Sequence, residues 1–126
     1  GMRVDIASRR PVIGNNQGGL SGPAIKPIAV FKVHQVYQVC RDRRIPIIGQ
    51  GGIVDGDDAL EFLIAGSSAV GVGTGLFYDP LCCPRINSAI GAYLDRHGFA
   101  NVSELTGTLE THGGDWPPTL PDGVAI

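Results

Sequence analysis

The chain has 126 residues, of which 43% are hydrophobic and 17% are charged, and its formal net charge is -2. This composition is typical of one soluble globular domain, and the small net charge gives no electrostatic reason to expect nucleic acid or an acidic membrane surface as a partner. No apolar run reaches the roughly 18 residues of a transmembrane helix, and no basic-then-apolar leader opens the chain, so we expect a cytoplasmic protein. The three cysteines include no C-x-x-C pair, and we expect reduced thiols.

A loose hairpin or extended arm is expected over residues 1–13, where apolar residues alternate only weakly. Residues 14–23 then form a polar, glycine-rich loop. A lone glycine cluster is usually a plain flexible turn, but this loop leads directly into a helix, with Ser21 as the expected cap and Pro23 near the first turn. The loop would present free N–H groups at the positive end of a helix, which suits a phosphate or an electron-rich ring edge.

A long helix is predicted over residues 24–42. His34 lies on this helix without a partner at ligand spacing, so we expect a solvated or packing role rather than a metal site. The apolar stripe, with spacings of four, three and four residues, consists of Ala29, Val33, Val36 and Cys40.

Two strands are predicted over residues 45–50 and 69–72, because each is a short apolar run bounded by small residues. A helix over residues 55–66 lies between them, with Asp55 and Asp58 as an expected capping box and a glycine at its end. Capping explains these carboxylates, so we expect neither acid–base chemistry nor a metal there. Strand, helix and strand form a βαβ crossover, which predicts parallel, adjacent strands that are buried on both faces.

Small residues follow both predicted strands, Gly51-Gly52 after the first and Gly73-Thr74 after the second. Together with the cluster from Gly18-Gly19 to Gly22, they are expected to lie on one rim. There, backbone N–H groups and the Thr74 hydroxyl would hold the phosphate of a cofactor. In (β/α)8 barrels a phosphate commonly binds after the seventh and eighth strands. The sequence shows no nucleophile–base pair, no metal-spaced His/Cys set and no Walker-type lysine.

Further helices are expected toward the end of the chain. The turn over residues 75–80 has room for a single helical turn, and a longer helix follows over residues 84–98. Residues 101–104 open a short helix that contains Leu105 and Leu109. The apolar face of the longer helix consists of Ile86, Ile90 and Tyr93.

Four segments together resemble the C-terminal part of dihydroorotate dehydrogenase, most closely the cytosolic class whose catalytic subunit pairs with an iron–sulphur flavoprotein. The resemblance extends from about Gly1 to Leu109, in order and with similar spacing. The segments are Gly18-Gly-Leu-Ser-Gly-Pro-Ala-Ile-Lys-Pro-Ile28, Ile45-Pro-Ile-Ile-Gly-Gln-Gly-Gly-Ile53, Asp57-Asp-Ala-Leu-Glu-Phe-Leu-Ile-Ala-Gly66 and Val70-Gly-Val-Gly-Thr74.

The resemblance implies an α/β fold, namely the C-terminal portion of a (β/α)8 TIM barrel, roughly its last two βα units and the preceding helix. A complete barrel takes about 250 residues, so the chain is either part of a longer protein or a smaller α/β unit. Residues 1–110 would belong to an FMN-binding barrel domain. Residues 111–126 are expected to form an irregular tail that is mobile or partner-dependent, although Trp116 could pin it to the domain.

The family oxidises dihydroorotate to orotate with FMN in pyrimidine biosynthesis. By resemblance, Gly22 meets the flavin region, while Gly51, Gly52, Gly73 and Thr74 hold the FMN phosphate. The resemblance also implies dihydroorotate and orotate as ligands of the complete enzyme, a homo-oligomer, and an iron–sulphur flavoprotein subunit as electron-transfer partner. It implies neither nucleic acid nor membrane as a partner.

The family's proton-abstracting cysteine, flavin-contacting lysine and substrate-binding asparagines belong to earlier barrel strands. None of them falls within this chain, so no catalytic residue is expected here and the chain alone is expected to be inactive. The chain departs from the family pattern at Gln17 and Gln50, both expected near the flavin. It also departs at Arg43-Arg44, which lengthens the turn before a strand.

Two alternatives to this assignment are compatible with the sequence. Dihydropyrimidine dehydrogenases share the GPA-x-[KR]-P-I pattern, but they usually carry Cys-Thr or Cys-Ser where this chain has Gly73-Thr74, which favours the dihydroorotate class. The second hypothesis is a non-catalytic half-barrel that self-associates to close its sheet and binds a phosphate compound or nucleotide without turnover. An intact mass well above that of this chain favours the enzyme part, and a stable, colourless homodimer favours the module.

Overall fold

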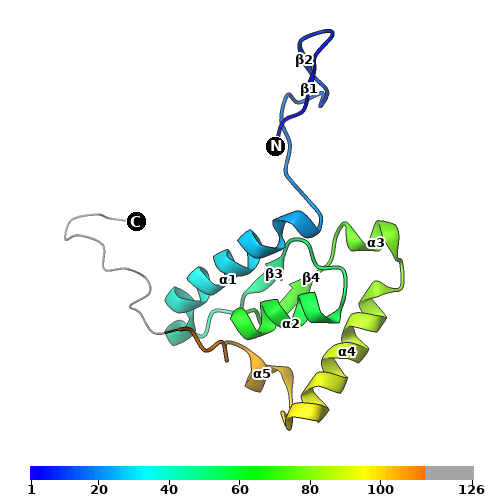
Figure 1. The fold of residues 1–126 in the computed structure, drawn as a ribbon. Coiled ribbons are helices and arrows are strands. Elements are labelled where there is room, and N and C mark those ends of the chain that lie inside the picture. The colour runs from blue at the N-terminus through cyan, green and yellow to red at the C-terminus, as the bar shows by residue number, and fades with distance from the viewer. Residues whose placement is uncertain (113–126) are drawn as a thin grey trace, which may run out of the picture.

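The architecture is an α/β unit in which helices pack against one pair of parallel strands (Figure 1). The structure is a computed structural model and describes residues 1–112. The α/β class expected from the sequence is confirmed. The elements in chain order are β1 (Val4–Asp5), β2 (Arg10–Pro11), a 3-10 helix (Pro23–Ile25), α1 (Lys26–Cys40), a second 3-10 helix (Arg41–Arg43), β3 (Ile48–Gln50), α2 (Gly56–Ala65), β4 (Ala69–Gly71), α3 (Gly75–Tyr78), α4 (Cys82–His97) and α5 (Val102–Leu105).

The predicted βαβ crossover is confirmed. β3 and β4 pair in parallel, with Ile48 opposite Ala69 and Gln50 opposite Gly71, and α2 connects them. β3 begins at Ile48 rather than at residue 45, because Pro46 has no N–H group to donate to a strand ladder. Because the two strands are parallel, their carboxyl ends meet at the same edge of the sheet.

One face of this strand pair is covered by helices, and the other is open within the described residues, so the prediction of strands buried on both faces is wrong. Gly49 faces the helices: a Cβ atom there would lie 2.6 Å from Phe62 Cδ1 and 2.3 Å from Ser67 Oγ. Its neighbour Ile48 points to the opposite side and is 64% exposed. Successive strand residues alternate between faces, and burial of the second face needs another layer, which residues 1–112 do not supply.

The central element of the core is α2, which packs against α1, α4 and β4. The predicted capping box is present. The Asp55 carboxylate accepts a hydrogen bond from the Asp58 N–H at 2.9 Å, and the Asp58 carboxylate accepts one from the Asp55 N–H at 3.3 Å. The helix ends at Gly66, whose φ of 125° favours glycine. The buried apolar side chains of α2 are Ala59, Leu60, Phe62, Leu63 and Ala65.

The entry into α1 differs from the prediction. A 3-10 turn over Pro23–Ile25 precedes the helix, and Gly22 occupies the N-cap position with φ 99° and without a side-chain hydrogen bond. The predicted Ser21 cap is therefore wrong. Glycine adopts this positive φ at little steric cost, so the backbone turns into the helix without a capping side chain.

The apolar stripe of α1 is only partly buried. Val33 lies in the core, whereas Val36 is 47% exposed. Val36 lines a shallow groove beside Ile48, on the side of β3 that no further strand covers within residues 1–112. His34 is 9% exposed, which favours the packing role over the solvated one.

The remaining helices follow the sequence closely. The single helical turn is present as α3, and α4 begins two residues earlier than expected, at Cys82. Ile86 and Ile90 of α4 are buried in the core, as predicted. In α5, Leu105 is buried, but Leu109 lies beyond the helix and is 43% exposed.

The N-terminal segment forms the expected hairpin, in which β1 and β2 are antiparallel. It projects away from the packed helices as an arm (Figure 1). No helix within residues 1–112 is both long and apolar enough to cross a membrane. Trp116 and most of the predicted tail lie outside the described residues.

Candidate functional site

A pocket of about 300 Å³ opens at the carboxyl edge of β3 and β4, beside the start of α1. The five site residues predicted from the sequence, Gly22, Gly51, Gly52, Gly73 and Thr74, all line it. Three segments that are distant in the sequence therefore meet at one place, while the role of these residues in binding stays a prediction. The other lining residues are Leu20, Ser21, Ile25, Gln50, Ile53, Val54, Gly71 and Gly75.

The turn at the end of β3 needs glycine at two successive positions. Gly51 and Gly52 have φ values of 124° and 78°, which side chains disfavour. A Cβ atom on Gly52 would lie 2.8 Å from the Gly22 carbonyl oxygen and 2.9 Å from Lys26 Cβ. The absence of a side chain at Gly52 lets the start of α1 approach the end of β3, and this approach closes one side of the pocket.

Gly73 at the end of β4 has a different environment. A Cβ atom there would meet no other atom within 4 Å, and the same holds for Gly22. Within the described residues, the backbone N–H groups of Gly52, Gly73 and Thr74 donate no hydrogen bond. Unpaired N–H groups beside open space form a cradle that suits an anion. None of the lining residues is charged, so the pocket offers backbone dipoles and a hydroxyl rather than a cation.

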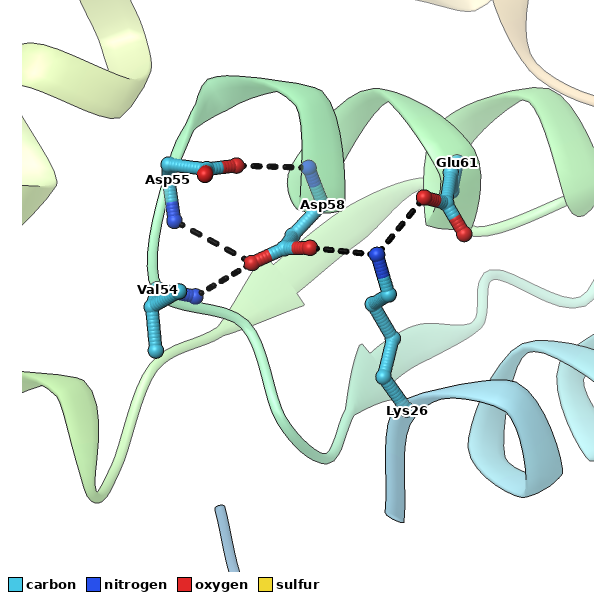
Figure 2. Close-up of polar contacts among 5 residues, drawn as sticks. All are labelled: Lys26, Val54, Asp55, Asp58 and Glu61. Carbon is cyan, nitrogen blue, oxygen red and sulfur yellow. Dashed lines mark hydrogen bonds and ion pairs between the residues drawn. The ribbon is translucent and has the colours of Figure 1, made fainter. Parts of the chain in front are cut away.

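An ion-pair cluster joins the start of α1 to α2, next to the pocket-lining residues Ile25 and Val54 (Figure 2). The Lys26 ammonium, at the start of α1, lies 2.5 Å from Asp58 Oδ1 and 2.7 Å from Glu61 Oε1, both on α2. The second carboxylate oxygen of Asp58 accepts hydrogen bonds from the backbone N–H groups of Val54 at 2.9 Å and Asp55 at 3.3 Å. Asp58 thus joins the start of α1 to the loop that leads from β3 into α2.

The protonation of this cluster follows from its contacts. Burial raises the pKa of Asp58, but the hydrogen bonds from Lys26 and from the Val54 N–H outweigh it, and the net pKa lies below the ordinary value of 3.8. The hydrogen bonds to Asp58 and Glu61 raise the pKa of Lys26 well above its ordinary value. Asp58 and Lys26 are therefore charged across the neutral range, and neither is suited to exchange protons there.

Sequence reasoning missed the Lys26 cluster and misplaced part of the rim. Gly18 and Gly19 do not line the pocket, and neither does Gln17, whereas Gln50 does. The Gly18 N–H instead donates to the carbonyl oxygen of Gly1 in the N-terminal arm. Lys26 and Asp58 are 32 residues apart, and no local spacing signals such a pair.

The residues that line the pocket include hydroxyl groups but no thiol and no base to activate a nucleophile. Cys40, Cys82 and Cys83 are free thiols and lie elsewhere, and burial, with a contribution from Cys83, raises the pKa of Cys82. Within residues 1–112, no group of three or more His, Cys, Asp or Glu side chains is placed to hold a metal ion. The arrangement is therefore suited to binding and orienting a ligand.

Comparison with known proteins identifies the family. The sequence profile of the family "Dihydroorotate dehydrogenase" matches residues 1–94. The chain is 51% identical over 107 residues to the dihydroorotate dehydrogenase B (NAD(+)) catalytic subunit of Bacillus cytotoxicus, which covers 85% of this chain and 34% of that protein. It is 53% identical over 109 residues to a Solibacter usitatus protein provisionally named dihydroorotate dehydrogenase A (fumarate), which covers 86% of this chain and 35% of the relative.

A solved structure is similar as well. Ligand-free dihydroorotate dehydrogenase from Eimeria tenella matches with a TM-score of 0.68 and 30% sequence identity, over 86% of this chain and 30% of the other chain. The chain spans about a third of the length of the curated relatives that it matches. The matched profile covers most of the described residues and the relatives are about half identical, so this chain belongs to the dihydroorotate dehydrogenase family.

Proposed function

We propose that this chain supplies the FMN phosphate-binding strand ends of a dihydroorotate dehydrogenase. In this proposal the N–H groups at Gly51-Gly52 and Gly73-Thr74, with the Thr74 hydroxyl, bind the phosphate, and Gly22 lies against the flavin. The single observation that carries the proposal is the pocket itself, which joins all three segments at one edge of a parallel strand pair.

The residues present fit a phosphate. The N–H groups of Gly52, Gly73 and Thr74 have no partner within the described residues. The space beside Gly73 is one that a side chain would fill. Phosphate oxygens accept several hydrogen bonds from backbone amides at such glycine-lined strand ends. The fit to a phosphate therefore depends on unpaired backbone N–H groups and on open space beside them, and not on a positively charged side chain.

We further propose that residues 1–110 are the C-terminal portion of a (β/α)8 barrel, roughly its last two βα units and the preceding helix, and that residues 111–126 form an irregular tail. The open face of β3 and β4 supports this, because parallel strands are almost always covered on both faces. A sheet of two strands is also marginal by itself. In a closed barrel, the exposed side of Ile48 would face the barrel interior.

When bound, FMN supplies the hydride acceptor for oxidation of dihydroorotate to orotate. The residues of this chain would bind the phosphate and thereby orient the flavin, while the proton-abstracting base and the substrate ligands lie outside this chain. A homo-oligomer and an iron–sulphur flavoprotein subunit are the proposed partners, and the cytoplasm is the proposed compartment. The relatives named above differ in their electron acceptor, NAD(+) in one and fumarate in the other.

The intact mass of the source protein, with an absorption spectrum, tests this proposal. We expect a polypeptide well above the mass of this chain, with a flavin absorption band that is released as FMN on denaturation. A protein of this chain's mass that is colourless and dimeric would instead support the alternative, a non-catalytic half-barrel that self-associates and binds a phosphate compound or nucleotide. The exposed Ile48 and Val39, at 64% and 75%, are compatible with that alternative as well, since such surfaces promote association.

A further inference from the structure

We propose a second binding site, for a small phosphorylated anion, in a cavity at the amino-terminal edge of β3 and β4. This cavity has a volume of about 560 Å³ and lies between the end of α1, the starts of the two strands and α5. It lies at the opposite ends of the strands from the pocket that contains Gly73, so the two cavities share no lining residue. Its lining residues are Tyr37, Arg41, Arg44, Ile45, Pro46, Gly66, Ser68, Ser103 and Thr106.

Positive charge is concentrated at this cavity. The net charge of the chain is -2, yet Arg41, Arg43 and Arg44, three of its ten Lys and Arg residues, fall within four positions, with Asp42 as the only acid among them. Two of these arginines, Arg41 and Arg44, line the cavity. The carboxyl end of a helix attracts basic residues in general, and this could explain the arginines by itself. The helix end does not, however, explain why two of them line a cavity.

The arginines are available to a ligand. Arg44 forms no ion pair within residues 1–112, and Arg41 has only a 3.9 Å contact to the neighbouring Asp42, whose side chain is 90% exposed. An exposed pair of this kind contributes little. Arg44 also has φ 52°, a conformation in which side chains are disfavoured and glycine is the usual residue. The shape of the turn therefore does not explain why residue 44 is an arginine, and a role of its side chain does.

Hydroxyl groups complete the cavity wall. Ser68 Oγ accepts a hydrogen bond from the Ile47 N–H at 3.4 Å, which leaves its own proton free to donate. Ser103 makes no hydrogen bond through its side chain within the described residues. Thr106 Oγ1 donates to the carbonyl oxygens of Ser67 and Val102, so it is already engaged.

Two arginines and two serine hydroxyl groups that line one cavity match the chemistry of a phosphate group, which accepts many hydrogen bonds and pairs with arginine in a bidentate manner. A cavity of this size, within the range of roughly 300–1,000 Å³ for small-molecule sites, has room for more than a single phosphate. Since no His, Asp, Glu, Lys or Cys lines the cavity to activate its hydroxyl groups, the bound molecule would be an effector or a stabilising ligand, not a substrate. The proposal does not depend on FMN binding at the opposite edge.

The test is calorimetric titration of inorganic pyrophosphate into the protein at its full natural length, saturated with FMN so that the other pocket is filled. The informative variant is Arg44→Gly combined with Arg41→Gln. Glycine suits the backbone at residue 44, so folding should be preserved, and equal melting temperatures check this. We expect pyrophosphate binding to weaken at least about tenfold, as expected for loss of charge-assisted hydrogen bonds, and Arg44→Lys to retain part of it.

Any of four results would overturn the proposal. One is equal affinity in the wild type and in the double variant. A second is an equal loss in the control Arg96→Gln, an arginine in the last turn of α4 that does not line the cavity. The third is binding of malonate as tight as that of pyrophosphate, which would assign the cavity to carboxylates. Loss of pyrophosphate binding in Gly73→Val alone would place the anion in the other pocket and would also contradict the proposal.

Discussion

Gly52 and Gly73 lie at the same edge of the sheet but are glycine for different physical reasons. A Cβ atom on Gly52 would lie 2.8 Å from the Gly22 carbonyl oxygen, whereas one on Gly73 would meet nothing within 4 Å. The first glycine is required by the packing of the protein itself. The second leaves space that the protein does not use, which is the pattern expected where a ligand approaches the backbone.

This difference gives a prediction for substitutions in the complete enzyme. Both Gly73→Val and Gly52→Val should abolish FMN retention, but Gly73→Val should keep the melting temperature of the FMN-free wild type. Gly52→Val should also lower that temperature, because its φ of 78° and its close contacts strain the backbone. Flavin absorbance after gel filtration and thermal unfolding of the FMN-free proteins measure the two effects.

The control for this experiment is Gly91→Val, on α4. A Cβ atom at this position also meets nothing within 4 Å, and Gly91 does not line the pocket. Flavin content should remain at the wild-type level in this control. A flavin-replete Gly73→Val enzyme would contradict the phosphate-site assignment.

At the residue scale, the sequence was sufficient to predict the glycines but not their neighbours. Gly51-Gly52 and Gly73-Thr74 follow apolar runs, and that local pattern placed them at strand ends. Lys26 was not recognised as part of the site, since its partners Asp58 and Glu61 belong to another helix and become neighbours only on folding. Gln17, expected near the flavin, does not line the pocket, because the glycine-rich loop leaves the sheet and joins the N-terminal arm.

At the scale of elements, the contact between α1 and α2 combines apolar packing with a part-buried ion pair. The side chains of Lys26 and Asp58 are 23% and 10% exposed. Replacement of Lys26 by Met should lower the free energy of unfolding by about 1–3 kcal/mol, because it leaves the Asp58 carboxylate part-buried without its cation. Chemical denaturation measures this loss.

Lys32→Met is the matched control, on the same helix and at an exposed position where, within residues 1–112, the polar contacts of the lysine are with Gln35 and the Phe31 ring. Its effect should stay within about 0.5 kcal/mol. If Lys26→Met and Lys32→Met lower the free energy of unfolding by the same amount, the Lys26–Asp58 ion pair does not stabilise the contact between α1 and α2.

The same pair predicts a pH dependence. The folded-state pKa of Asp58 is lowered below 3.8, so its stabilisation is present above that value and is lost as the pH falls through the folded-state pKa. The pKa of Lys26 is raised, so the contribution of Lys26 is present below its ordinary value of 10.5 and is lost only at higher pH. Stability should therefore decline below about pH 4.

Asp58→Asn removes this titrating group and should flatten the acid limb of the stability profile, measured as the free energy of unfolding between about pH 3 and pH 7. An acid limb as steep in Asp58→Asn as in the wild type would show that other carboxylates account for the decline.

The elements themselves were predictable where local chemistry determines them. The capping box at Asp55 and Asp58 and the glycine end of α2 were predicted from residue type and spacing alone. The limits of β3 were not, because Pro46 shortens the strand. The Ser21 cap was also wrong, since the positive φ of Gly22 turns the backbone without it.

At the scale of the whole molecule, the open face of β3 and β4 is the main departure from the sequence prediction. Apolar strand residues such as Ile48 predict burial, but burial depends on layers that residues 1–112 do not contain. The pattern of apolar residues therefore predicts which strand face is buried in the complete protein, but it does not predict which segment covers that face.

The purified 126-residue chain should not oxidise dihydroorotate, because the proposal assigns the family's base and substrate ligands to parts of the enzyme outside this chain. Reduction of a dye in the presence of dihydroorotate and FMN measures turnover, with the complete enzyme as the positive control. Substrate-dependent dye reduction by this chain alone would refute the assignment of catalysis to the remainder of the enzyme.

The central claim is that the tips of two neighbouring parallel strands bind the phosphate of FMN through backbone amides. The most direct measurement compares the affinity of the FMN-free complete enzyme for FMN and for riboflavin, which lacks the phosphate, by quenching of flavin fluorescence. FMN should bind at least about a hundredfold more tightly, since charge-assisted hydrogen bonds contribute about 1.5–3 kcal/mol each, and Gly73→Val should remove that preference. Equal affinity for riboflavin and FMN in the wild-type enzyme would contradict the account.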